Sequence, residues 1–196
     1  MRLLLATHNE HKMREFARML DSAGRGEYEL VALPERVTLP SEDGETFAVN
    51  ALEKARAAAA ATGAVAIADD SGIEAAALAG APGVRSARYA GELATDAENL
   101  EKLVREVPAG SALRYVCALA YVDPSAGVER LFEGTCEGRL AAHPRGERGF
   151  GYDPAFVPDD TRGERTMAEL SDSEKDAISH RGRALSELVR WLEHRP

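Results

Sequence analysis

The sequence predicts an α/β fold, with a mixed sheet and flanking helices arranged as two lobes around a central cleft. Short apolar runs alternate with stretches of helical periodicity early in the chain, and two longer apolar runs joined by a turn follow later. The chain has 196 residues, of which 44% are hydrophobic, enough to bury one sizeable core. No repeat or low-complexity linker interrupts it, so we expect one domain over residues 1–196.

The early elements follow from apolar periodicity and from residues that stop helices. The run 2–6 is short and apolar, which is typical of a buried strand, and apolar residues then recur at the spacing of one helix face, at Met13, Phe16, Ala17 and Leu20. The elements expected next are a strand at 28–33, a polar loop at 34–44, an alanine-rich helix at 46–62 stopped by Gly63, and a brief strand at 65–68.

The later elements include a hairpin and a final helical region. The segment 79–91 is rich in glycine and small residues, so we expect it to be irregular. It is followed by a helix at 95–107 ended by Pro108, strands at 113–122 and 128–136 joined by a turn at 123–127, and a loop at 146–158. Ser171 and Glu174 predict a capping box that opens a helical region reaching Trp191.

Composition argues against several classes of protein. The formal net charge of −9 at pH 7 argues against non-specific nucleic-acid binding, which depends on basic surface. The apolar run near the N-terminus is too short for a signal peptide or a membrane span, and no later stretch is long enough to cross a bilayer. Cys117 and Cys136 lack metal or redox spacing, so we expect two reduced thiols in a cytoplasmic protein.

The segment from Thr7 to Lys12 joins the first expected strand to the first expected helix. Free N–H groups and partial positive charge at a helix N-terminus suit phosphate, and Thr7, Asn9 and Lys12 can add donors and a cation. An ordinary helix cap followed by a solvated lysine explains the segment equally well. His8 and His11 do not indicate a metal site, because no third ligand lies nearby.

Two adjacent aspartates, Asp69 and Asp70, directly follow an apolar strand. Neighbouring strand residues point to opposite faces, so we expect one aspartate to face a site and the other to fix the turn. Mg²⁺ prefers oxygen ligands and completes its shell with water and substrate phosphates, and the acidic Glu42-Asp43 loop can supply a second carboxylate. A turn without metal is the alternative, although two acids at a strand end favour a functional site.

Two charged residues fall on apolar faces of expected helices. Lys54 lies among Phe47 and two alanines, where a lysine must either extend to water or meet an anion, and extension to water is the more common outcome. Arg181 shares a stripe with Leu185 and Leu188. Its partner is either a ligand or an internal carboxylate, and the carboxylate is the usual case.

Glycines flank an aromatic residue in the segment Gly149-Phe150-Gly151-Tyr152-Asp153-Pro154. Small neighbours would let a flat base approach the backbone and stack on Phe150. Taken alone, the segment is more typical of a tight turn around a core aromatic.

Together and in this order, these segments resemble the motifs of the inosine triphosphate pyrophosphatase family of nucleotide hydrolases. The resemblance spans nearly the whole chain, and its last two motifs are the most specific. The matching residues are Thr7-x-Asn9-x-x-Lys12, Ala68-Asp69-Asp70-Ser71-Gly72, Gly80-Ala81-Pro82-Gly83 with Ser86-Ala87-Arg88-Tyr89, Gly149-Phe150-Gly151-Tyr152-Asp153-Pro154, and Ser179-His180-Arg181-Gly182-x-Ala184.

The resemblance implies a homodimer that uses Mg²⁺ to hydrolyse non-standard purine nucleoside triphosphates, ITP, dITP and XTP, to the monophosphate and pyrophosphate. It implies that Glu42 and Asp70 bind the metal, and that Asp70 acts as base toward water. The residues implied for the triphosphate are Thr7, His8, Asn9, Glu10, His11, Lys12, Lys54 and Ser71. Those implied for the base and sugar side are Phe150, Gly151, Tyr152, Asp153, Lys175, His180 and Arg181.

Two other functions stay open on the sequence. A related pyrophosphatase for modified pyrimidine nucleotides has an N-terminal signature that fits this chain less well. A catalytically silent nucleotide-binding regulatory protein is disfavoured by Asp69 and Asp70, because a binder of anionic phosphate gains nothing from acids unless a metal is present.

Overall fold

The computed structural model describes residues 1–24 and 26–195, and the chain divides into two compact units. Unit 1 comprises Met1–Asp70, Cys117–Gly134 and Arg181–Pro196, and unit 2 comprises Ser71–Val116 and Thr135–His180. The boundaries between the units fall within three strands and within the first turn of the last helix.

The strands form a mixed sheet in the order β2-β1-β3-β4-β5-β6, which confirms the predicted α/β class. β1 pairs in parallel with β2 and β3, whereas β5 pairs with β6 in antiparallel fashion. The strands are β1 (Arg2–Leu5), β2 (Glu29–Ala32), β3 (Ala66–Ala75), β4 (Ala112–Asp123), β5 (Val128–Leu140) and β6 (Phe156–Pro158).

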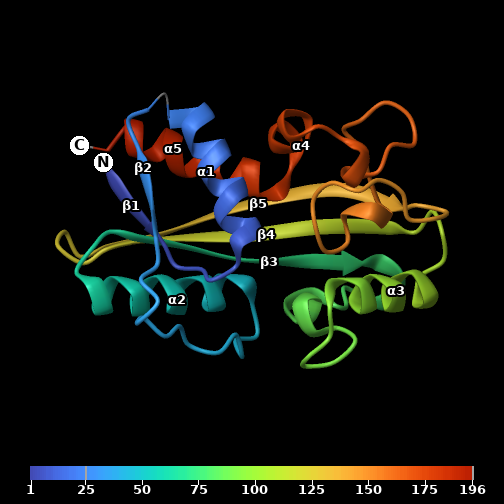
Figure 1. Cartoon of the computed structure of the whole chain (residues 1–196), viewed down its shortest axis with the longest axis horizontal. Coiled ribbons are helices and arrows are strands. Elements are labelled where there is room, and N and C mark those ends of the chain that lie inside the picture. Colours follow the sequence, from blue (N-terminus) through green and yellow to red (C-terminus); the bar gives the residue numbers. More distant parts are fainter. Residues whose placement is uncertain (25, 196) are drawn as a thin grey trace. The chain divides into compact units, whose positions relative to one another are not determined.

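In unit 1, helices cover both faces of the parallel strands. α1 (Glu10–Gly24) and α5 (His180–Glu193) lie on one face, and α2 (Phe47–Thr62) lies on the other (Figure 1). The chain passes from β1 through α1 to β2 on one side, and then through α2 to β3 on the other side of β1. Strand order therefore reverses at β1, and in such sheets ligands bind at the carboxyl ends of the strands beside this point.

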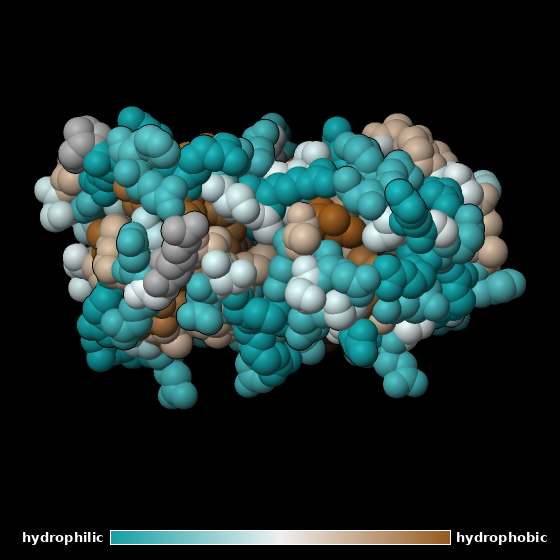
Figure 2. Space-filling view, turned by 90° about the horizontal axis from the view of Figure 1, so that it is seen from above, coloured by the Kyte–Doolittle hydropathy of each residue, from teal (hydrophilic) through white to brown (hydrophobic). Residues whose placement is uncertain are grey.

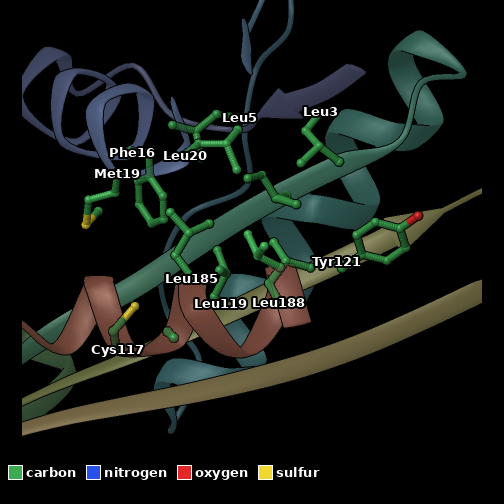
Figure 3. Packing of buried hydrophobic residues seen from close by; sticks show 13 residues of the cluster. Leu3, Leu5, Phe16, Met19, Leu20, Cys117, Leu119, Tyr121, Leu185 and Leu188 are labelled. Carbon is green, nitrogen blue, oxygen red and sulfur yellow. The ribbon is translucent and has the colours of Figure 1, made fainter. Parts of the chain in front are cut away.

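The core of unit 1 packs α1 and α5 against the strands. Figure 3 shows Phe16 and Met19 of α1 and Leu185 of α5 converging on Leu5 of β1 and Leu119 of β4. All five side chains are buried. This packing explains the helical spacing of apolar residues near both ends of the sequence, and it fixes where the first turns of α1 and α5 lie.

Unit 2 has a core of its own, built around the other halves of β3, β4 and β5. Leu103 of α3 (Asp96–Glu106) and Phe156 of β6 are fully buried in it, and α4 (Asp172–Ile178) lies in the same unit. Short 3₁₀ helices over Ala76–Leu78, Gly83–Arg88, Asp153–Ala155 and Met167–Glu169 complete the unit.

Several predicted local features are confirmed. Gly63 ends α2 with a φ of 68°, a left-handed conformation that suits glycine, and Thr46, expected as the first residue of this helix, is its N-cap. Ser171 and Glu174 form the expected capping box at the start of α4. Cys117 and Cys136 are buried thiols that form no disulfide.

Other elements differ from the prediction. β3 continues to Ala75 rather than ending at residue 68, and β5 continues to Leu140 rather than residue 136. The expected loop at 146–158 contains β6 and the expected irregular segment at 79–91 contains a 3₁₀ helix. The final helical region is two helices, because Ser179 adopts an extended conformation between α4 and α5.

The surface is largely polar on the face that Figure 2 shows. The face of the molecule seen in Figure 2 is mostly hydrophilic, with only small hydrophobic areas between polar side chains. Among the described residues, no helix combines the length and apolar character that a bilayer crossing requires.

Candidate active site

The segment Thr7–Lys12 lies at the carboxyl end of β1 and leads into α1. Asn9 caps the helix, because its Oδ1 accepts hydrogen bonds from the N–H groups of His11 at 2.9 Å and Lys12 at 3.1 Å. Thr7 Oγ1 in turn accepts a hydrogen bond from the N–H of Asn9 at 3.1 Å. The helix N-terminus is thus held open toward solvent at the switch point of the sheet, where an anion is stabilised.

Three side chains of this segment contact protein groups. His8 Nε2 lies 3.2 Å from the carbonyl oxygen of Val37, Glu10 pairs with Arg14 at 3.6 Å, and His11 Nδ1 lies 3.0 Å from Arg14 Nη2. These contacts are compatible with the prediction that positions 8 and 10 meet a phosphate through backbone N–H groups, whereas the N–H of His11 already donates to Asn9 Oδ1.

Lys12 does not extend into solvent, contrary to the alternative of an ordinary helix cap followed by a solvated lysine. Its Nζ lies 3.0 Å from Asp69 Oδ2, and the lysine side chain is only 14% exposed. Arg181 Nε approaches the same aspartate oxygen at 3.2 Å, and Arg181 Nη1 lies 3.1 Å from Glu15 Oε2. Asp69 therefore joins the starts of α1 and α5 in one buried ionic cluster, which we call the Asp69 cluster: Lys12, Glu15, Asp69 and Arg181.

Opposing forces act on the carboxyl group of Asp69. Complete burial alone would raise its pKa, but the cations of Lys12, Arg181 and Lys54 hold the pKa well below its usual range. The carboxylate is thus ionised at all ordinary pH values. The expectation that this aspartate fixes a turn is wrong, since Asp69 lies inside β3 and pairs with side chains from two helices.

Asp70 faces the opposite way, as strand alternation predicts. Its Oδ2 accepts a hydrogen bond of 2.7 Å from Asn50 Nδ2 on α2. Asn50 Oδ1 also accepts a hydrogen bond of 2.8 Å from the N–H of Gly44, so one amide side chain orients Asp70 and anchors the acidic loop. Burial raises the pKa of Asp70, and the nearby carboxylate of Glu42 raises it further.

Lys54 meets an anion rather than water, contrary to the more common outcome. It forms a close ion pair with Glu42 and donates a hydrogen bond of 2.7 Å to the carbonyl oxygen of Asp69. Burial lowers the pKa of Lys54, but Asp69, Glu42 and Asp70 outweigh burial and raise it overall. The lysine therefore remains charged.

The donor set around Asp70 fits a hard divalent cation. Asn50 connects Asp70 to Gly44, two residues after Glu42, and the carboxylate of Glu42 raises the pKa of Asp70. A cation bound between these two acids would offset their repulsion. Over residues 1–24 and 26–195, no group of three or more potential protein ligands could hold a metal alone. Two carboxylates suit Mg²⁺ in particular, because this ion keeps several waters and takes further oxygens from phosphates.

Unit 2 contains a second cluster, centred on Asp153 and called the Asp153 cluster: Tyr115, Phe150, Asp153, Lys175 and His180. Asp153 Oδ2 accepts hydrogen bonds from Lys175 Nζ at 2.6 Å and from the N–H of Phe150 at 3.0 Å. Lys175 Nζ lies 5.3 Å from the centre of the Phe150 ring. Gly149 has a φ of 73°, and a Cβ there would overlap Asp153 Oδ2, so the loop requires glycine at this position.

Two other residues expected on the base side are held within unit 2. The Tyr152 hydroxyl donates a hydrogen bond of 2.7 Å to the carbonyl oxygen of Ser86, and the Tyr152 side chain is buried. The N–H of Gly151 donates to Asp96 Oδ2 at 3.0 Å. Tyr152 thereby ties the motif at 149–154 to the motif at 80–89.

The structure separates two neighbours in the sequence. His180 stacks on Tyr115 in the Asp153 cluster, whereas Arg181 belongs to the Asp69 cluster. An internal carboxylate was the usual case expected for Arg181, and the structure confirms it. Ser71, expected at the triphosphate, follows Asp70 in β3 and is partly exposed.

Three residues that contact the predicted site residues were not predicted from the sequence: Glu15, Asn50 and Tyr115. Asn50 gave a usable signal, because it lies one helical turn before Lys54 on the same apolar face of α2. Glu15 gave no such signal, because a residue next to Phe16 points about 100° away from it on a helix, and its burial is seen only in the structure. Tyr115 gave none, since an aromatic residue in an apolar strand is ordinary.

Known proteins resemble this chain over its full extent. The model of the Ham1 family matches residues 3–191. The dITP/XTP pyrophosphatase of Mycolicibacterium paratuberculosis is 50% identical over an alignment 197 residues long, and this alignment covers 97% of this chain and 95% of that protein. The dITP/XTP pyrophosphatase of Symbiobacterium thermophilum is 50% identical over an alignment 199 residues long, and this alignment covers 100% of this chain and 95% of that protein.

Solved structures share the fold. A HAM1 protein from Coxiella burnetii has a TM-score of 0.86 at 40% identity, with 99% of each chain covered. A nucleoside-triphosphatase, or dITP/XTP pyrophosphatase, from Mycobacterium abscessus has a TM-score of 0.72 at 44% identity, with 98% of this chain and 100% of that chain covered. Similarity in sequence and in structure along nearly the whole length shows that the chain belongs to the Ham1 family.

Proposed function

We propose that this protein hydrolyses non-standard purine nucleoside triphosphates, such as dITP, XTP and ITP, to the monophosphate and pyrophosphate, and so removes them from the nucleotide pool. The two relatives described above, each about half identical, are dITP/XTP pyrophosphatases. The observation that carries the proposal is the difference in surroundings between two neighbouring residues of β3. Asp69 is neutralised by buried cations, whereas Asp70 is held by Asn50 beside Glu42.

The phosphate side of the reaction is assigned to the start of α1, to Lys54 and to Ser71. The N-terminus of α1, with Thr7 and Asn9, would bind phosphate oxygens, and Lys54 and Ser71 would add further donors. Glu42 and Asp70 would hold Mg²⁺. When bound, this ion would neutralise phosphate charge and orient the triphosphate for attack at the α-phosphorus.

Asp70 is also the proposed base. Its Oδ2 already accepts the hydrogen bond from Asn50, which leaves the carboxylate oriented to accept a proton from an attacking water. Lys54, charged and buried, would stabilise the negative charge that develops on the phosphates.

The base and sugar side is assigned to the Asp153 cluster with Gly151, Tyr152 and Arg181. A purine would stack on Phe150, and donors from this set would meet the 6-oxo group. A 6-amino purine would leave such donors unpaired, at a cost of about 1–3 kcal/mol for each buried donor. The site would therefore discriminate ITP from ATP.

We also propose a homodimer and a cytoplasmic location. The homodimer follows from the resemblance to the inosine triphosphate pyrophosphatase family, and light scattering at several protein concentrations tests it. The two buried thiols, which form no disulfide, are consistent with a reducing compartment. The two alternatives, a pyrophosphatase for modified pyrimidine nucleotides and a silent nucleotide-binding protein, gain no support from the relatives.

One turnover panel tests the proposed function. ITP, dITP, XTP, ATP, GTP and a modified pyrimidine triphosphate are incubated with the protein and Mg²⁺, and the products are separated by chromatography. We expect monophosphate and pyrophosphate in equal amounts from ITP, dITP and XTP. Diphosphate and orthophosphate as products, or no turnover of any nucleotide, would refute the proposal.

A further inference from the structure

Tyr115 on β4 contacts two residues of the proposed base side at once. Its hydroxyl donates a hydrogen bond of 3.1 Å to Asp153 Oδ1. Its ring stacks on the imidazole of His180, with 4.6 Å between ring centroids and 7° between ring planes. Tyr115 is itself buried, with 6% of its surface exposed, and Phe156 packs against its ring at 4.6 Å.

Asp153 connects the Tyr115 hydroxyl to Lys175 and Phe150. Its second oxygen accepts the hydrogen bonds of Lys175 at 2.6 Å and of the Phe150 N–H at 3.0 Å. A carboxylate has about four acceptor positions, so protein donors already occupy most of those on Asp153. Asp153 is also 3% exposed. It is therefore better placed to orient Lys175 and Phe150 than to contact a base directly.

The contacts of Tyr115 thus converge from separate parts of the chain. Phe150 lies in the loop before the 3₁₀ helix that Asp153 begins, Lys175 lies in α4, and His180 begins α5. An aromatic ring fixed by packing and a hydroxyl fixed by a charged acceptor lose little freedom when the substrate binds, which is the basis of preorganisation.

We propose that Tyr115 is a positioning residue for base recognition, an inference that rests on the proposed function. Its hydroxyl fixes Asp153, and through Asp153 it fixes the ammonium of Lys175 and the backbone of Phe150. Its ring sets the plane of His180. Tyr115 therefore controls base binding without touching the base.

Two substitutions separate these two effects. Tyr115→Phe keeps the ring and its stacking on His180 but removes the donor to Asp153. Tyr115→Leu removes both. For Tyr115→Phe we expect the KM for ITP to rise about tenfold with kcat changed less than about twofold, the signature of lost ground-state binding. For Tyr115→Leu we expect a larger rise in KM, and for both variants a smaller ratio of kcat/KM for ITP over ATP.

Tyr121→Phe is the matched control, because Tyr121 is a buried tyrosine on the same strand, and its hydroxyl contacts Arg195 at 2.5 Å and Asp123 at 3.5 Å. It should lower the Tm but leave the KM for ITP unchanged. An unchanged KM in Tyr115→Phe, or an equal rise in Tyr121→Phe, overturns the assignment of Tyr115. A wild-type protein that releases no pyrophosphate from ITP overturns the proposed function instead, so the two failures are distinguishable.

Discussion

Replacing Asp69 by asparagine tests whether the Asp69 cluster stabilises the fold. The substitution conserves volume but leaves Lys12 and Arg181 without their shared carboxylate, which lies 3.0 Å from the first and 3.2 Å from the second. Removing one partner of a buried ion pair costs about 3–5 kcal/mol. We expect about 3 kcal/mol, the low end, because Arg181 keeps Glu15 at 3.1 Å and Lys12 is close enough to the surface to reach water.

The same cluster predicts how this loss depends on pH. The pKa of Asp69 is lowered in the folded protein, whereas an unfolded aspartate titrates near about pH 3.9. The folded state therefore binds this proton less readily than the unfolded state, and the stabilisation is fully present above about pH 4. The difference between wild type and Asp69→Asn should be constant from about pH 7 to 5 and should shrink as the pH falls below about 4.

Asp70→Asn provides the matched comparison on the next residue. Burial and Glu42 raise the pKa of Asp70, so without metal the charge of this carboxylate destabilises the folded protein relative to the unfolded chain. Removing that charge should leave the free energy of unfolding unchanged or increase it, while nearly abolishing turnover and preserving nucleotide binding.

Urea unfolding in chelator, followed by the fluorescence of the single tryptophan, Trp191, measures both variants in unit 1. A loss of about 3 kcal/mol corresponds to about a 150-fold change in the unfolding equilibrium, well within reach of the method. If Asp69→Asn loses less than about 1 kcal/mol, or if Asp70→Asn loses as much, the buried ion-pair argument is wrong.

Three further outcomes concern activity. Excess chelator should stop pyrophosphate release from ITP and added Mg²⁺ should restore it; full activity in chelator would contradict the site at Glu42 and Asp70. Asn50→Ala should lower kcat about 10–100-fold and should also lower the free energy of unfolding by about 1–3 kcal/mol, because Asp70 and the N–H of Gly44 both lose a hydrogen-bond partner; steady-state kinetics would reveal an unaltered kcat if Asn50 is dispensable. Phe150→Ala should lower kcat/KM by a similar factor, about tenfold, for ITP and ATP, since stacking tolerates base identity; a loss confined to ITP would mean that Phe150 selects the base.

Elements with strong local signals were predictable from the sequence. Residues that cap or stop a helix act within one helical turn, so their effect can be recognised from neighbouring residues alone. Thr46, Gly63 and Ser171 are of this kind. The parallel strands and their helices likewise followed from apolar periodicity. The strand β6, by contrast, has three residues between a 3₁₀ helix and a turn, which is too short for a periodic pattern.

The extension of β3 was hidden because its stability comes from distant residues. Asp69 and Asp70 are polar and precede a glycine, which is typical of a turn. The cations that allow Asp69 to be buried in a strand come from Lys12 and Arg181, 57 and 112 residues away in the sequence. Local propensity carries no information about such pairing, so the strand was predicted to end too early.

The sequence also did not predict that His180 and Arg181 belong to different clusters. Both belong to one motif, and the resemblance placed both beside the base. The extended backbone of Ser179 starts a new helix at His180, and successive residues of a helix point in different directions, about 100° apart. One residue therefore stacks on Tyr115 while the next pairs with Asp69.

The make-up of the ionic groups near β3 has a consequence for the order in which ligands assemble. Lys12, Lys54 and Arg181 are cations, whereas Glu15, Glu42, Asp69 and Asp70 are acids, so these seven side chains carry one excess negative charge when all are ionised. A bare triphosphate would meet a local field that does not attract it, while a triphosphate already bound to Mg²⁺ brings part of the missing positive charge. Affinity for nucleotide and affinity for metal should therefore be thermodynamically linked, each rising as the concentration of the other increases.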